Sequence, residues 1–441
     1  MRAMKRRQVC LLLAFVVVLS LGVLPVNAQE PIVIDFYYPT AVGGPITEIL
    51  EGYAAQFEEA NPGIDINPVY QGDYTQLRTT VQTEMQGGGT GPDVAVMLAT
   101  DLFSFVEEGY IIPAQGFIDQ MEDGEAYVDD FFPALLLNSY DEDGVLWSIP
   151  FQRSTPILFY NKDQFAEVGL DPEDPPQNRD ELVEYAQQLA LPDGERWGLM
   201  LPVAGGFPIW LFQSFAIANG QNIVSDDPSV VTFNDPKVTE ALEFMVALGD
   251  DGISPAGGSA WGDTPTAFTS GQAAMIYHTT GSLTNILNNA DFEVGVAYLP
   301  SGPANDEGLG YGTPTGGGNM YIFDDGTKTP EELDAIWRWI EFLSSPEIQA
   351  DWTVQTGYIA ARQSAWETDT LVNLLAEHPQ YGVARDQLTF ADREFSSYRA
   401  IDVQGIINTT LSSVLSGSET DAQAALDGAQ AQIDSLLEEY R

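Results

Sequence analysis

Along the first part of the chain, short apolar runs typical of strands take turns with segments in which apolar residues recur at helical spacing. Residues 32–38 (Ile-Val-Ile-Asp-Phe-Tyr-Tyr) form an apolar run that is typical of a strand. Apolar side chains then recur at helical spacing over residues 46–57, until Asn61-Pro62-Gly63 ends the helix. Two further apolar runs, at 64–70 and 94–98, predict strands on either side of a second, polar helix. This order predicts a mainly parallel sheet covered by helices, and therefore an α/β fold.

A second region of strands and helices follows a turn at residues 141–144. Residues 147–151 and 157–160 read as strands, and a crossing strand is expected at 295–299. A helix with three large aromatic side chains is expected at 333–343. No period of 20 to 50 residues repeats along the chain, which excludes a solenoid.

The first 28 residues have the layout of a secretory signal peptide. Basic residues precede an apolar run at 9–24, and Val26-Asn27-Ala28 offers small residues at a cleavage point. We expect cleavage after Ala28, with retention as an N-terminal anchor as the alternative. Cys10 is the only cysteine, so the mature protein would hold no thiol, disulfide or cysteine-based metal site. The predicted location is the periplasm or the extracellular space.

The composition narrows the class of partner. The predicted signal holds four of the 17 basic residues and none of the 65 acidic ones, which leaves 13 basic residues and a net charge of −52. Such a surface repels nucleic acid and anionic lipid, so neither is expected as a partner. It fits a salty or an acidic habitat equally well. The 44% hydrophobic content and eight tryptophans exclude general disorder.

Catalytic motifs are missing from the sequence. It contains neither a phosphate loop of the form G-x-x-x-x-G-K-[ST] nor a G-x-S-x-G elbow, and it has only two histidines. We therefore expect no enzyme, no metal and no cofactor. Two glycine clusters, at 308–312 and 316–318, lack the strand and helix context of a nucleotide loop. They are interpreted as backbone that approaches a ligand or flexes as a hinge, or as a plain surface loop.

Six segments in order resemble the extracellular solute-binding proteins of carbohydrate-type ABC importers. They cover nearly the whole mature chain and lie at residues 56–63, 91–94, 156–163, 169–172, 268–275 and 345–347. The resemblance implies a two-lobed α/β fold with a hinged cleft. It places residues 29–140 and 296–357 in the first lobe, and 141–295 and 358–441 in the second. Ligand would close the cleft, and the closed monomer would be read by a membrane permease whose ATPase is a separate subunit.

Within this family, the pattern is most similar to the subgroup that binds sn-glycerol 3-phosphate and glycerophosphodiesters. It matches at residues 72–74, 151–156, 280–283 and 356–358. The resemblance implies that hydroxyls, a glycine and an arginine hold the ligand phosphate; these residues are Tyr74, Ser154, Thr279, Gly317, Tyr358 and Arg399. Arg399 would supply a fork of donors that matches phosphate oxygens. Each residue also has a structural alternative, such as a turn, a helix cap or a salt bridge, and for Arg153 a surface salt bridge is expected.

Two departures concern the glycerol end of the ligand. The acidic residue that binds the glycerol hydroxyls in the subgroup falls at Ala99, with Asp101 nearby as a substitute. The tryptophan that packs on the glycerol falls at Gly206 or Phe207, with Trp210 one helical turn further on. A larger head group, as in a glycerophosphodiester or a sugar phosphate, would fit these changes.

Two other functions compete with a glycerol phosphate ligand. A neutral oligosaccharide would use aromatic platforms and carboxylates, which Trp210, Trp261 and Asp101 could supply, and would leave Arg399 without a role. An extracellular hydrolase is the more remote alternative, because abundant carboxylates do not by themselves indicate a catalytic pair.

Overall fold

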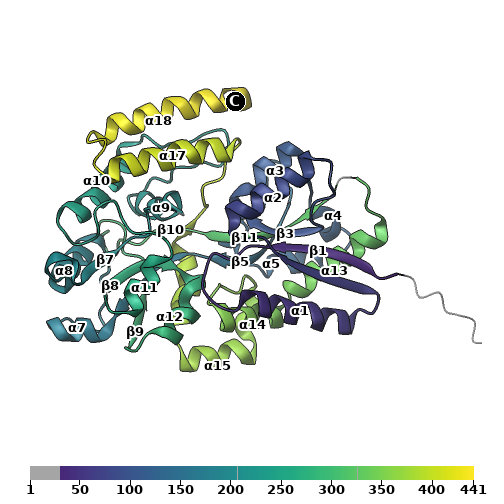
Figure 1. The fold of residues 1–441 in the computed structure, drawn as a ribbon, viewed down its shortest axis with the longest axis horizontal. Coiled ribbons are helices and arrows are strands. Elements are labelled where there is room, and N and C mark those ends of the chain that lie inside the picture. The colour runs from purple at the N-terminus through teal and green to yellow at the C-terminus, as the bar shows by residue number, and fades with distance from the viewer. Residues whose placement is uncertain (1–29, 206, 325) are drawn as a thin grey trace, which may run out of the picture.

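The computed structural model describes residues 30–205, 207–324 and 326–441. The predicted signal peptide at 1–28 and its cleavage point lie outside the described residues, as does Gly206. Among the helices of the described ranges, none is both long and apolar enough to cross a membrane. Figure 1 shows two groups of helices, each around its own sheet, with β5 and β11 between them.

The first sheet has the strand order β2-β1-β3-β11-β4, and β5 also pairs with β11. Its strands are β1 (Ile32–Tyr38), β2 (Ile64–Tyr70), β3 (Val94–Leu98), β4 (Ile111–Ile112), β5 (Ile149–Ser154) and β11 (Gly316–Phe323). β2, β1 and β3 are parallel, while β11 runs antiparallel to its neighbours. The prediction of a parallel αβ unit at the start of the chain is confirmed.

The pleat of this sheet assigns its side chains to two cores. Val94 and Val96 belong to the core that includes α1 (Ile46–Ala60) and α13 (Pro330–Leu343), whereas Ala95 and Met97 belong to the core with α2 (Tyr74–Gln86) and α3 (Leu102–Glu108). Alternate residues of a strand point to opposite faces, so an unbroken apolar run is needed when both faces are covered. Short helices complete this part of the chain: α4 (Gln115–Ile118), α5 (Gly124–Asp129) and α6 (Pro133–Leu136).

The second sheet has the order β7-β8-β6-β9. Its strands are β7 (Trp197–Met200), β8 (Ala273–Thr279), β6 (Pro156–Asn161) and β9 (Val294–Ala297). The helices between them are α7 (Lys162–Val168), α8 (Arg179–Leu189), α9 (Pro208–Ala218), α10 (Pro236–Asp250), α11 (Asp263–Thr269) and α12 (Leu283–Asn289). The C-terminal helices α17 (Ala400–Leu415) and α18 (Ala422–Leu437) pack on α9 and α10, and apolar residues of all four share one core. Figure 1 shows the C-terminal pair in yellow along the edge of this lobe.

Sheet membership does not coincide with the expected lobe boundaries at 140 and 295. β5, expected in the second lobe, pairs with β11 of the first sheet. β9 pairs with β6 of the second sheet, and β10 (Thr313–Pro314) pairs with β12 (Ala391–Asp392). The strands thus change sheet near residues 155 and 315. The division of the chain into lobes stays a prediction.

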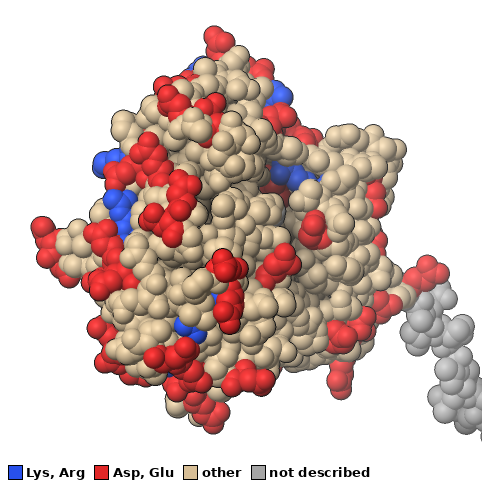
Figure 2. All heavy atoms as spheres, turned by 60° about the vertical axis from the view of Figure 1, so that its left-hand side comes forward, with Lys and Arg blue, Asp and Glu red and all other residues tan. Residues whose placement is uncertain are grey.

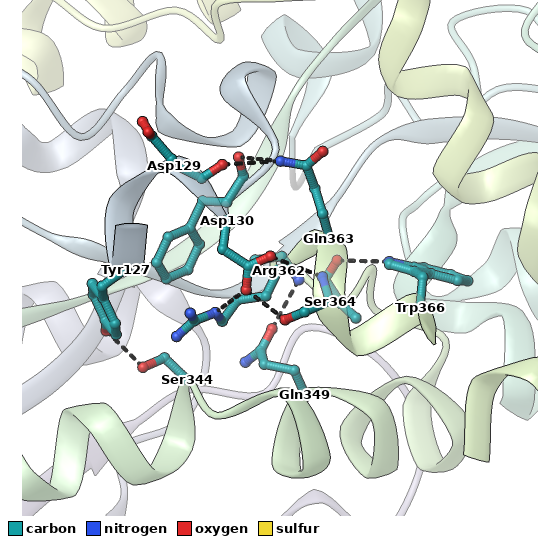
Figure 3. Close-up of polar contacts among 12 residues, drawn as sticks. Tyr127, Asp129, Asp130, Ser344, Gln349, Arg362, Gln363, Ser364 and Trp366 are labelled. Atoms are coloured by element: carbon teal, nitrogen blue, oxygen red, sulfur yellow. Dashed lines mark hydrogen bonds and ion pairs between the residues drawn. The ribbon is translucent and has the colours of Figure 1, made fainter. Parts of the chain in front are cut away.

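A polar cluster joins two segments that are distant in the sequence, around residues 130 and 362 (Figure 3). The Asp130 carboxylate accepts hydrogen bonds from Arg362 Nε at 2.6 Å, from the Ser364 amide at 2.9 Å and from the Ser364 hydroxyl. We call Asp130, Arg362 and Ser364 the Asp130 clamp. The Arg362 guanidinium also lies 4.7 Å from the centre of the Tyr127 ring. The remaining helices follow α13: α14 (Pro346–Thr356), α15 (Asp369–Glu377) and α16 (Gln380–Asp386).

Candidate ligand-binding cleft

A cleft lies between the two sheets. Residues of both lobes line it: Ala41, Val42, Tyr74, Leu98, Ser154, Phe207, Trp210, Trp261, Thr279, Gly317, Tyr358 and Glu394. Five of the six residues that the resemblance implied for ligand binding are in this set. The structure therefore brings together positions that are up to 284 residues apart in the sequence, from Tyr74 to Tyr358.

Strand register explains why three of these residues meet. Ser154 ends β5 and pairs with Gly316, one residue before Gly317 in β11. Pro156 begins β6 and pairs with Thr279, the last residue of β8. Because β5 and β6 are separated by a single residue, the ends of two different sheets converge at Ser154, Thr279 and Gly317.

Three hydroxyl groups of the cleft are available for a ligand. Among the described residues, the side-chain hydroxyls of Ser154 and Tyr358 have no hydrogen-bond partner, and the Thr279 hydroxyl only accepts a bond, from the Gly281 amide at 3.1 Å. The Tyr358 ring stacks on Trp352, which stacks on Phe151. Burial raises the pKa of Tyr358, so this hydroxyl stays protonated and can donate a hydrogen bond.

Two supports hold the cleft floor in place. The buried Tyr74 hydroxyl donates to Gln152 Oε1 at 3.0 Å, and Asp73 forms a capping box with Gln76 at the start of α2. Gly317 has φ +88°, and a Cβ there would lie 1.9 Å from the Gln152 carbonyl oxygen. This position therefore requires glycine, both for its backbone conformation and for the space. Its cluster, 316–318, begins a strand rather than a plain surface loop.

One wall of the cleft is aromatic. Phe207 and Trp210 from the start of α9 pack with Trp261, at ring-centroid distances of 5.1 and 5.9 Å from it. Trp261 Nε1 donates to the Ala41 carbonyl at 2.8 Å, and this bond links the two lobes across the cleft. Trp210 Nε1 donates to the Thr315 carbonyl at 2.8 Å. Phe207 and Trp210, two of the residues predicted to contact the head group, thus both line the cleft.

A carboxyl and a guanidinium are buried at the floor without pairing directly. Glu394 is 7% exposed and its Oε2 has no hydrogen-bond partner among the described residues. Arg153 is fully buried; Nη1 donates to the Gly317 carbonyl at 3.1 Å, while Nε and Nη2 have no partner. Burial raises the pKa of Glu394 to about 8, and the charge of Arg153 offsets only part of this effect. The prediction of a surface salt bridge for Arg153 is wrong, because the residue is fully buried in β5, where it pairs with Gly317 of β11.

The remaining predicted residues lie outside this set. Arg399, at the start of α17, pairs with Asp402 at 2.7 Å and approaches Glu439 at 3.7 Å, and its side chain is 37% exposed. Ala99 is fully buried and does not line the cleft. Asp101 is buried beside it and pairs with Arg78 at 2.5 Å.

Sequence reasoning missed Glu394 altogether. It stands between Arg393 and Phe395 in a segment without a recognisable motif, and it reaches the floor because its amide and carbonyl both bond to the Asn138 side chain, at 3.1 and 2.9 Å. No local pattern in the sequence predicts a contact between Glu394 and Asn138, which are 256 residues apart.

Comparison with known proteins agrees with this architecture. The model of the family described as bacterial extracellular solute-binding protein matches residues 52–379, which is more than half of the chain. The chain belongs to this family of extracellular solute-binding proteins. The two-lobed α/β fold that the resemblance implied is confirmed.

Individual relatives cover almost the full length. The sn-glycerol-3-phosphate-binding periplasmic protein UgpB of Escherichia coli is 26% identical, over 96% of both chains. The protein of the same name from Salmonella typhimurium is 27% identical, over 90% of this chain and 91% of that one. UgpB from Mycobacterium tuberculosis, solved with glycerophosphocholine, has 24% identity and a TM-score of 0.79, covering 93% of this chain and 99% of that one. A maltotriose-bound domain from Bdellovibrio bacteriovorus has 21% identity and a TM-score of 0.76, covering 92% and 100%.

Proposed function

We propose that this protein captures sn-glycerol 3-phosphate, a glycerophosphodiester or a related phosphorylated polyol. The observation that carries the proposal is the convergence of Tyr74, Ser154, Thr279, Gly317 and Tyr358 on one cleft. Full-length relatives named for sn-glycerol 3-phosphate binding support the same ligand class.

The chemistry of the cleft suits a phosphate held mainly by neutral donors. The hydroxyls of Ser154, Thr279 and Tyr358 would each donate to a phosphate oxygen. Glu394, with its pKa near 8, is mostly protonated at neutral pH and would donate as well. None of the described lining residues is a lysine or an arginine. The proposed role of Arg399 as the cationic anchor therefore requires residues 398–400 to rearrange when ligand binds.

We further propose that the chain is exported by its N-terminal signal, which is cleaved after Ala28. The periplasmic relatives support this location. The protein would work as a monomer that delivers its ligand to the permease of the importer, without nucleic acid as a partner. Figure 2 shows many acidic and few basic side chains on the face it presents, as the charge of the sequence requires. A free anionic ligand is repelled by such a surface at long range, so capture would depend on short-range donors.

Calorimetric titration of the purified protein with sn-glycerol 3-phosphate, with glycerol as the blank, tests the ligand class. Binding of the phosphate alone would support the proposal, and no heat from any glycerol phosphate would overturn it. Arg399→Ala then tests the anchor. Loss of a charge-assisted phosphate contact is expected to weaken binding by about 2 to 5 kcal/mol. Unchanged affinity in this variant would remove Arg399 from the site.

A neutral oligosaccharide is the second candidate. The aromatic wall of Phe207, Trp210 and Trp261, the carboxyl of Glu394 and the lack of a basic residue in the described lining favour it. Sugar rings stack on aromatic faces, and their hydroxyl groups both donate hydrogen bonds to and accept them from a protonated carboxyl group; neither contact needs a cation. Heat with maltotriose and none with sn-glycerol 3-phosphate would establish this function in place of the first.

A further inference from the structure

A second cavity adjoins the cleft on the side of α2 and α17. It is open to solvent and shares Tyr74, Leu98 and Phe207 with the cleft. The first lobe contributes Arg78 and Asp101, and the second lobe contributes Ile209 and Asn408. We call this cavity the polar compartment. The cleft and the polar compartment therefore lie side by side between the lobes.

Arg78 and Asp101, which line the polar compartment, form a buried ion pair. Arg78 Nη1 lies 2.5 Å from Asp101 Oδ1, and the two side chains are 11% and 1% exposed. Arg78 Nε and Nη2, as well as Asp101 Oδ2, are buried and have no hydrogen-bond partner. Across the compartment, Asn408 Oδ1 is buried and without a partner too. All three residues line the compartment, and buried donors and acceptors without partners are costly unless a ligand satisfies them.

These atoms define the chemistry of the occupant. The ion pair carries no net charge, so it neither requires nor favours a charged ligand. The two nitrogens of Arg78 need acceptors, whereas Asp101 Oδ2 and Asn408 Oδ1 need donors. A hydroxyl group supplies both functions, and Phe207, Ile209 and Ile401 offer apolar surface for the carbon skeleton between hydroxyls.

We propose that the polar compartment binds a polyhydroxylated head group, such as the inositol, glycerol or glycosyl unit of a glycerophosphodiester. This inference rests on the proposed function, because it places the glycerophosphate moiety of the same ligand in the cleft. A quaternary ammonium head group would face Arg78 and leave its nitrogens unsatisfied. A second phosphate would face Asp101, which is fixed beside the same cavity.

Calorimetric titrations of the full chain with four ligands test the preference. The probes are sn-glycerol 3-phosphate, glycerophosphoinositol, glycerophosphoglycerol and glycerophosphocholine. We expect the two hydroxylated diesters to bind at least about tenfold more tightly than sn-glycerol 3-phosphate, as two or three additional hydrogen bonds allow. Glycerophosphocholine should not share this gain.

Two variants locate the effect. Asn408→Ala should lower the ratio of glycerophosphoinositol affinity to sn-glycerol 3-phosphate affinity about fivefold. Thr409→Ala is its control, because Thr409 is the next residue of α17 and does not line the compartment. Combined Arg78→Met and Asp101→Asn removes both charges at once, so neither partner is left buried and alone. This double variant should abolish the preference for hydroxylated head groups.

The possible failures are distinguishable. Binding of sn-glycerol 3-phosphate with no dependence on the head group would overturn the compartment and leave the proposed function standing. Tightest binding of glycerophosphocholine would overturn it as well. No binding of any of the four ligands would overturn the proposed function, and the compartment proposal with it.

Discussion

The Asp130 clamp and the cleft floor each bring an arginine and a carboxyl group together from distant parts of the chain, but they satisfy them differently. In the clamp, Asp130 accepts bonds from Arg362 Nε, the Ser364 amide and the Ser364 hydroxyl (Figure 3). At the floor, Arg153 and Glu394 lie beneath the cleft without a direct ion pair, and each keeps polar atoms unpaired.

The pKa values of the two carboxyl groups are shifted in opposite directions. Burial alone would raise the pKa of Asp130, but the hydrogen bonds from Ser364 and Arg362 lower it below its usual value. Burial raises the pKa of Glu394 to about 8 because no such donors reach it. A carboxylate whose hydrogen bonds are all satisfied stabilises the fold. A buried carboxyl group without partners destabilises it, and a ligand that supplies the missing hydrogen bonds can recover that free energy. Both places bury a charged group, so the degree to which their hydrogen bonds are satisfied is what distinguishes the structural contact from the proposed binding site.

The largest expected effect is at Gly317, which holds the floor. Gly317→Ala should destabilise the protein by on the order of 4 kcal/mol, because the new methyl would overlap the Gln152 carbonyl at a positive φ. Gly308→Ala is the matched control: its φ is +83° and a Cβ there has open space. It should cost only about 1 kcal/mol, from backbone strain alone. Denaturant unfolding of both variants measures the difference, and equal losses would show that steric overlap is not what requires Gly317.

Glu394→Gln tests the unpaired carboxyl. The folded state holds its proton up to about pH 8, whereas the unfolded chain releases it near 4.5. Stability from this group is therefore complete below pH 4.5, declines as the pH rises, and is lost above 8. Between about pH 5 and about pH 9, the wild type should lose on the order of 3 kcal/mol relative to the glutamine variant. Parallel pH profiles of unfolding free energy for the two proteins would contradict an unpaired, buried Glu394.

Removal of the clamp carboxylate should have a somewhat smaller effect. Asp130→Ala leaves the Arg362 guanidinium partly buried without its ion-pair partner, and should cost about 2 to 3 kcal/mol. The 20% exposure of the Asp130 side chain keeps the cost below that of a fully buried pair. Asp129→Ala, at the neighbouring exposed carboxylate, should stay within about 0.5 kcal/mol of the wild type. Similar melting temperatures for the two variants would mean that the clamp is not structural.

The smallest effect is expected from Ser364→Ala. The Ser364 hydroxyl bond to Asp130 is lost, but Arg362 and the Ser364 amide still satisfy the carboxylate. We expect a loss of about 1 kcal/mol in unfolding free energy. A loss as large as that of Asp130→Ala would show that the three donors act as one cooperative unit.

Local patterns predicted most of the elements closely. The strands expected at 32–38, 64–70 and 94–98 are observed with those bounds, and α1 ends at Ala60, immediately before the predicted stop. The spacing of apolar residues in a strand or a helix involves only nearby positions, so it can be recognised without knowing how the rest of the chain folds. The crossing points near 155 and 315 were not predicted, because sheet membership is decided by pairing partners far away in the sequence.

For the candidate site too, some features could be predicted from the sequence and others only from the tertiary structure. The sequence by itself determined the α/β class and, through family resemblance, identified five residues that the structure brings to one cleft. Only the tertiary structure decided that Arg399 pairs with Asp402, that Arg153 is buried, and that Glu394 lines the cleft while Arg78 and Asp101 line the cavity beside it. A residue type indicates what a side chain can bind, but its burial and its partners depend on where every other segment lies, and those determine whether its charge is paired, exposed or left for a ligand.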